Sequence, residues 1–211
     1  MDLNDLSDRL RKEFDVRLAA REQSLSGSRE VIRACRNAIR ALHRDEIERA
    51  TELMDEAQMH LDKARTGLAE HPDVLYAGFV HDAEKELAEA RITLALVTDA
   101  PFPSPESLDL PPAAFLKGMA EAIGEVRRHI LDLMRRQQLE RCEHLLGAMD
   151  EMYYLLVSMD YPDGITYGLR RLTDVARSII ERTRGDFTTS KVQSALRAAL
   201  EDHTMKLEGD L

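Results

Sequence analysis

Apolar residues recur at every third or fourth position along almost the whole chain, which is the period of one face of an α-helix. The chain's prolines fall between these segments, at positions 72, 101, 103, 105, 111, 112 and 162. No segment shows the alternation of a strand. We therefore predict an all-α protein, an antiparallel bundle of about seven to eight helices forming a single domain over 1–211, with helices at about 2–24, 28–43, 45–70, 74–97, 112–136, 138–159, 164–184 and 188–206.

Three helix starts carry capping signals. Asp45 followed by Glu48 resembles a capping box. The alternative is that 28–43 and 45–70 form one long kinked helix. We expect Asp73 to cap the fourth helix, and Asp163 with Gly164 to cap the seventh.

One segment is apolar around most of the helix circumference. It reads MYYLLV from Met152 to Val157, whereas a helix on the outside of a bundle needs one apolar stripe. Two interpretations remain: a central helix of a monomer, or a helix that a second subunit also covers.

The amino-acid composition indicates a folded protein and argues against several classes of protein. The 211 residues are 44% hydrophobic and 32% charged with a net charge of −10, so a sizeable core is expected and nucleic acid cannot coat the whole surface. The chain contains neither a long apolar span nor a signal-peptide core, and we expect a cytoplasmic protein without membrane contact. Cys35 and Cys142 lack the spacing of a disulfide framework or a zinc site.

Five arginines form a ridge on the second predicted helix. They fall within an arc of about 80° at 100° per residue, and apolar residues occupy the opposite side. Arginine suits phosphate oxygens, so the arginine ridge predicts a nucleic-acid backbone site. The alternative is ion pairing with acidic residues on another helix. The members are Arg29, Arg33, Arg36, Arg40 and Arg44.

Two carboxylate pairs lie on the predicted helices 74–97 and 112–136. Glu86 with Glu89, and Glu121 with Glu125, each share one side of a helix. On helical wheels both pairs flank the same-handed edge of the apolar face. If these helices pack antiparallel, the four side chains converge on one or two Mg²⁺ ions. The alternative is a solvated face, because such spacings are common and Glu140 with Glu143 forms another pair.

The sequence lacks the motifs of other metal sites and of nucleophilic catalysis. No Glu has a His three positions later, which disfavours a di-iron bundle. The sequence also lacks HExxH, a Gly-rich phosphate loop and GxSxG.

The order and spacing of four segments resemble the translin family, especially its microbial members, over nearly the whole chain. They are SREVIRACRNAIRALHR, FVHDAEKELAEA, PAAFLKGMAEAIGEVRRHIL and YPDGITYGLRRLTDVARSIIERTRGDFT. The resemblance implies an all-helical protein that assembles into a closed hollow homo-oligomer, an octamer or hexamer, and binds RNA, with single-stranded DNA as a further ligand.

The resemblance also implies chemistry. The catalytic branch, translin-associated factor X, is a Mg²⁺-dependent endoribonuclease, with Mn²⁺ as an alternative ion. Its motifs match KELAEA and GMAEAIGE, so Glu86, Glu89, Glu121 and Glu125 would be the catalytic and metal-binding residues, with Glu121 where the family more often has Asp. The arginine ridge falls in the family's basic region from Arg29 to Arg40; Arg44, Arg170 and Arg171 match it more loosely. The alternative function is a non-catalytic RNA- or DNA-binding shell.

Overall fold

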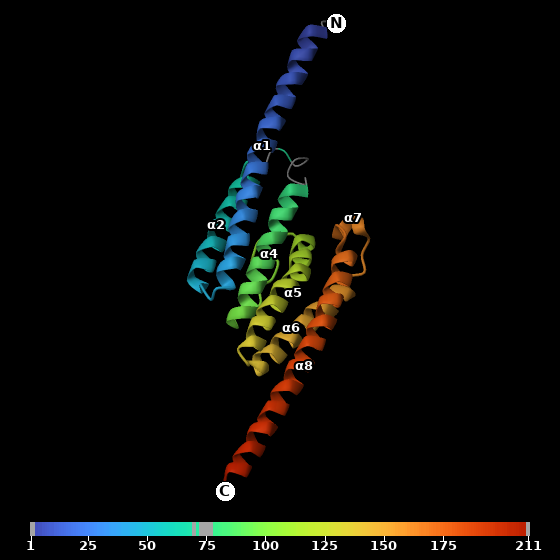
Figure 1. Ribbon diagram of the computed structural model, residues 1–211. Helices are drawn as coiled ribbons and strands as arrows, with labels where there is room; N and C mark the ends of the chain where they lie inside the picture. Colours follow the sequence, from blue (N-terminus) through green and yellow to red (C-terminus); the bar gives the residue numbers. More distant parts are fainter. Residues whose placement is uncertain (1–2, 69–70, 72–77, 210–211) are drawn as a thin grey trace. The chain divides into compact units, whose positions relative to one another are not determined.

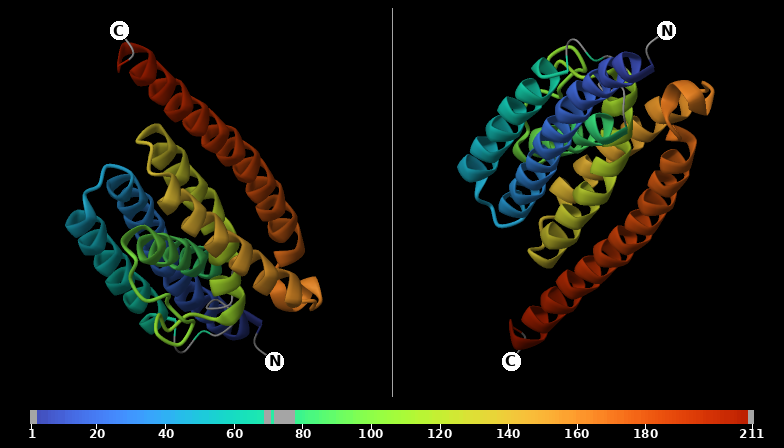
Figure 2. Two further views of the ribbon diagram at one scale, coloured as in Figure 1. Left: turned by 90° about the horizontal axis from the view of Figure 1, so that it is seen from below. Right: turned by 90° about the horizontal axis from the view of Figure 1, so that it is seen from above.

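The computed structural model describes residues 3–68, 71 and 78–209 (Figures 1 and 2). These residues contain helices and no strand, which confirms the all-α prediction. The helices that it describes are α1 Leu3–Leu42, α2 Ile47–Thr66, α4 Gly78–Thr98, α5 Pro112–Arg135, α6 Leu139–Ser158, α7 Asp163–Thr166 and α8 Leu169–Gly209.

The chain divides into two compact units, Met1–Met119 and Ala120–Leu211. In the first unit α1 packs against α2 and α4, and α2 also contacts α4. α1 and α2 lie side by side in each view (Figures 1 and 2). In the second unit α6 packs against α8. The boundary falls inside α5, which is continuous; that the whole chain is one domain stays a prediction.

α1 is one helix of 40 residues, so the predicted break near residue 25 is wrong. Gly27 lies against α2, where an added Cβ would approach the Cβ of Ala64 to 3.1 Å. Ser24 and Ser28 are buried on either side of it. These small residues let the two helices approach closely, and this packing outweighs the weak helix propensity of Gly and Ser.

A turn separates α1 from α2, which rules out the long kinked helix. Asp45 has a left-handed backbone with φ 62°. α2 begins after Glu46, whose side chain makes no capping hydrogen bond, so the predicted capping box is wrong. Asp73, the expected cap of the fourth helix, lies outside the described residues.

The C-terminal helices also differ from the prediction. Pro162 occupies the N-cap position of the short α7, and Asp163 is its first helical residue, so the prediction that Asp163 caps this helix is wrong. Tyr167 and Gly168, at φ 52° and 81°, separate α7 from α8. α8 then continues through residues 185–187, where a break was expected. Thr183 and Phe187, one turn apart, are both buried, so packing carries the helix through this segment.

The apolar segment of α6 is buried on one side only. Met152 and Leu156 are buried. Tyr154, Leu155 and Val157 are 70%, 41% and 51% exposed. The interpretation as a central helix of a monomer is therefore wrong for these three residues, whose apolar surface faces outward. None of the described helices has the length and apolarity to cross a membrane.

Candidate metal centre and nucleic-acid interface

A glycine fixes the approach of α5 to α4. A Cβ on Gly118 would lie 2.5 Å from the Cβ of Ala88, 2.6 Å from the carbonyl oxygen of Lys85 and 2.8 Å from the amide nitrogen of Glu89. Such distances leave no room for a side chain, so only glycine permits this contact. The contact holds the start of α5 directly against the KELAEA segment of α4.

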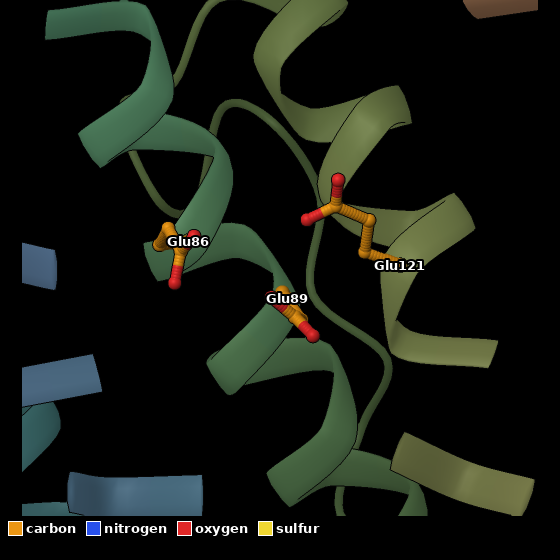
Figure 3. Close-up of side chains that lie close together, drawn as sticks. All are labelled: Glu86, Glu89 and Glu121. Atoms are coloured by element: carbon orange, nitrogen blue, oxygen red, sulfur yellow. The ribbon is translucent and has the colours of Figure 1, made fainter. Parts of the chain in front are cut away.

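Three carboxylates meet beside this contact. Glu86 and Glu89 come from α4, and Glu121 stands one turn after Gly118 on α5 (Figure 3). All three are half-buried, and one oxygen from each lies within 4.8 Å of the others. Because α5 is continuous, the Gly118 contact also determines where Glu121 lies. We call these three residues the carboxylate group.

The carboxylate group fits a hard divalent cation. Mg²⁺ binds carboxylate oxygens at about 2.1 Å, so two ligands of one ion lie up to about 4.2 Å apart. The observed spacing needs only a small side-chain adjustment to reach that value. Half-buried carboxylates at this spacing also repel one another, and a bound cation would relieve the repulsion.

Two cationic side chains flank Glu86. Nζ of Lys85 lies 3.4 Å from Oε1 of Glu86, and Nε of Arg36 lies 3.6 Å from Oε2. Lys85 and Glu86 are 13% and 14% exposed, so solvent screens their pair only partly. These contacts orient the Glu86 carboxylate and offset part of the negative charge.

Cys35 lies near the carboxylate group on the α1 side. Burial raises the pKa of its thiol, and the charges of Glu86 and Glu89 raise it further. The thiol therefore stays protonated at neutral pH, which makes it a poor metal ligand or nucleophile. Cys35 is a neutral part of the core beside the candidate site.

Glu125 is not a member of the carboxylate group. It is half-buried and lies one turn beyond Glu121 on α5. At 1.5 Å per residue, Glu125 is about 10 Å along the helix from Gly118, whereas Glu121 is about 4.5 Å away. The distance from the α4–α5 contact thus separates two residues that the helical wheel placed together.

The arginine ridge is exposed on α1 and, at Arg44, in the turn that follows, as a backbone-binding surface requires. The ridge also has an acidic neighbour on its own helix, because Glu30 forms an ion pair with Arg33. Arg36 reaches Glu86 on α4, which is the kind of inter-helix ion pair that the alternative interpretation expected. The structure therefore contains one ion pair of the kind that the alternative interpretation expected, and this pair links the ridge to the carboxylate group. That the ridge binds a nucleic-acid backbone stays a prediction.

Arg170 and Arg171 lie at the start of α8 in the second unit, and both are exposed. Arg170 pairs with Asp160 at 3.2 Å. Since both partners are more than 80% exposed, this pair contributes little to stability.

Two residues of the site, Lys85 and Gly118, were not predicted from the sequence. Both lie inside the quoted motifs, KELAEA and GMAEAIGE. A lysine next to a glutamate on a charged helix carries no signal by itself. The role of Gly118 depends on the contact between α4 and α5, which the periodicity does not give.

Known proteins resemble this chain over most of its length. No family model matches it. An uncharacterised protein of Methanocaldococcus jannaschii, MJ0175, is 31% identical over 173 residues, which cover 81% of this chain and 76% of the relative.

Solved structures of two proteins are also similar. AfC3PO, solved in complex with duplex RNA, is 33% identical with a TM-score of 0.82, over 88% of this chain and 96% of its own. A second AfC3PO structure has a TM-score of 0.81, with 88% and 97% coverage. Apo-NeC3PO is 17% identical with a TM-score of 0.78, over 87% of this chain and 96% of its own, a likeness of fold alone.

Proposed function

This chain belongs to the translin family, and from that premise we propose that it is a Mg²⁺-dependent endoribonuclease. The single observation that carries the proposal is the convergence of Glu86, Glu89 and Glu121 within 4.8 Å. Family membership alone does not separate a nuclease from an RNA-binding shell. A group of carboxylates suited to a hard cation favours the nuclease.

Each residue of the carboxylate group and its neighbours has a role in the proposed reaction. Glu86, Glu89 and Glu121 would hold Mg²⁺ or Mn²⁺, with Glu125 contributing through water. When bound, the cation would neutralise charge on the scissile phosphate and lower the pKa of an attacking water. Lys85 and Arg36 keep Glu86 oriented. A carboxylate that is not a ligand can accept the proton of the water.

The arginine ridge would hold the RNA. Guanidinium groups contact phosphate oxygens of any sequence, so we expect weak base preference. AfC3PO has been solved with duplex RNA; the ridge suits a duplex or a single strand, because both present their phosphates outward. Single-stranded DNA offers the same phosphates and is expected to bind as well.

Incubation of end-labelled RNA with the pure protein tests the proposal. Mg²⁺ or Mn²⁺ should give internal cleavage of single-stranded RNA, and excess chelator should abolish it. Binding without cleavage under every metal condition would leave the non-catalytic shell as the function. Cleavage that persists with chelator would refute the metal mechanism.

We predict that Arg29→Gln with Arg33→Gln reduces the salt dependence of RNA binding. Each phosphate contact to a single strand adds about 0.7 to the slope of log affinity against log salt, so the slope should fall by about 1.4. Fluorescence anisotropy across a salt series measures it. Arg135→Gln with Arg177→Gln removes two exposed arginines elsewhere and should leave the slope unchanged. An unchanged slope in the ridge variant would assign the ridge to structure.

We also propose that the protein self-assembles into a closed homo-oligomer. The support is apolar surface in the second unit: Tyr154, Val157, Tyr161 and Ile165 are each at least 51% exposed. Exposed apolar patches of this kind mark interfaces. Closed symmetry then gives a particle of several subunits, with an octamer or hexamer expected.

Multi-angle light scattering at micromolar concentration should give a mass several times 23.9 kDa. Tyr154→Lys with Val157→Lys should lower that mass, because burying two ammonium groups in an apolar interface is costly. Ser178→Lys with Gln193→Lys adds the same charge at exposed polar positions and should not. A monomeric mass for the wild-type protein would refute the proposed self-assembly.

A further inference from the structure

A turn joins the end of α1 to the start of α2 (Figure 1). A recess of about 290 Å³ lies beside this turn. Three arginines line it: Arg40 from the last turn of α1, Arg44 from the turn that follows, and Arg49 from the first turn of α2. All three are exposed. Each guanidinium presents a planar fork of donors, so together they suit an anion with several oxygens. Arg49 is not part of the arginine ridge.

The existing partners of these arginines are weak competitors for such an anion. Arg49 pairs with Glu52 at 2.8 Å, but the two side chains are 58% and 65% exposed. An exposed pair of this kind contributes little and exchanges readily for another anion. The contact of Arg40 with Asn37 is long, at 3.4 Å, and its acceptor is neutral. Binding a charged ligand would therefore disrupt little.

The backbone adds to the positive potential. α2 is 20 residues long and starts beside the recess, with Glu46 at its N-cap. The first amide groups of a helix lack intrahelical acceptors, and this end of the helix carries partial positive charge. The Glu46 side chain makes no capping hydrogen bond to these amides.

The charge balance of the recess distinguishes between kinds of phosphate. Among the residues that line the recess, three arginines against Glu46 leave a formal charge of +2 once the exposed Glu52 side chain turns away from Arg49. This charge is close in size to the charge of about −1.5 to −2 of a phosphomonoester near pH 7. An internal phosphodiester carries a single charge. The recess therefore suits the end of a phosphorylated strand better than its interior.

We propose that this recess binds the terminal phosphomonoester of an RNA strand. The proposal rests on the RNA binding proposed above, and it adds recognition of a strand end. Arg36, which contacts Glu86, lies four residues before Arg40 of the recess on α1, or about 6 Å along the helix axis. A strand anchored in the recess would run along α1 toward the carboxylate group.

Binding measurements without divalent cation test the site independently of catalysis. We would compare three oligoribonucleotides of one sequence, carrying a 5′-phosphate, a 3′-phosphate or two hydroxyl ends, by fluorescence anisotropy. One phosphorylated form should bind about tenfold more tightly than the hydroxyl form, the scale of charge-assisted hydrogen bonds. Its identity tells which strand end the recess takes. Inorganic phosphate should compete with that form more strongly than with the hydroxyl form.

Variants separate the recess from the ridge. Arg44→Gln with Arg49→Gln should reduce the favoured form to the affinity of the hydroxyl form. Arg29→Gln, on the ridge outside the recess, should weaken all three forms by the same factor. Glu46→Gln should enlarge the preference, because it removes the one negative charge of the recess.

Two results would overturn the proposal: equal affinity of the wild type for all three forms, or a preference that survives in the Arg44→Gln/Arg49→Gln variant. Equal, salt-dependent binding would refute this site and leave the proposed function intact. Failure to bind any of the three forms would refute both.

Discussion

Replacing Glu89 with glutamine is expected to lower the Mg²⁺-dependent rate of RNA cleavage about 10²- to 10³-fold. The substitution keeps the length of the side chain and removes the charge that a hard cation requires, which costs several kcal/mol of transition-state stabilisation. RNA affinity should stay equal or rise, because a negative charge near the phosphates is lost. Single-turnover cleavage and anisotropy under identical conditions measure the two effects.

The matched control is Glu140→Gln. Glu140 belongs to another pair of glutamates at helical spacing, on α6, and is exposed. Its loss should change neither rate nor affinity. Wild-type rates in the Glu89 variant would contradict the assignment of the carboxylate group, whereas loss of folding would indicate a structural role for that residue.

The Glu125→Gln substitution distinguishes the role that the observed geometry gives Glu125 from the role that the family resemblance implies. The resemblance implies that Glu125 is a ligand equal to the others, but this residue lies outside the carboxylate group. A residue that acts through water is expected to matter less, with a loss of about 10- to 100-fold. The ratio of the Glu125 and Glu89 effects therefore reports how directly each carboxylate holds the cation.

Gly118→Ala is expected to destabilise the protein by about 2–3 kcal/mol, a typical cost of overpacking. The new methyl group would meet Ala88 and backbone atoms of Lys85 and Glu89 at 2.5–2.8 Å, so α4 and α5 must separate. The melting temperature should fall by about 4–12 °C for a chain of this length. Cleavage should fall as well, because the same contact brings Glu121 to Glu89.

Gly147→Ala provides the control for helix propensity. Gly147 lies in α6, and an added Cβ there would meet nothing within 4 Å. This substitution should stabilise the protein by about 0.5–1 kcal/mol. Calorimetry should show a lower melting temperature for Gly118→Ala and a higher one for Gly147→Ala, because of these two glycines only Gly118 is closely packed. A Gly118→Ala protein as stable as the wild type would contradict the α4–α5 contact.

The fold class follows from local information that the sequence contains. Helical periodicity and the positions of the prolines sufficed to predict α5 and α6 to within a residue or two. The errors occurred where tertiary packing opposes local preference. Gly27 interrupts a helical pattern by propensity, but its contact with Ala64 keeps α1 continuous. Residues 185–187 are similar, because the burial of Phe187 holds α8 together.

The candidate site was predictable only in part. The wheel positions identified Glu86, Glu89 and Glu121 as residues of one edge, and the structure brings them together. The wheel gives angle but not height along the helix, so it also included Glu125. The contact of Glu86 with Arg36 depends on how α1 approaches α4, and single-helix periodicity contains no such information.

The central claim is that Glu86, Glu89 and Glu121 hold a divalent cation, and anomalous diffraction from crystals soaked in Mn²⁺ tests it most directly. Manganese takes the same oxygen ligands as magnesium and gives an anomalous signal. We predict a peak among the three carboxylates that disappears in Glu89→Gln crystals. Manganese peaks elsewhere with none among these carboxylates, in crystals where the three side chains are ordered and accessible, would contradict the account.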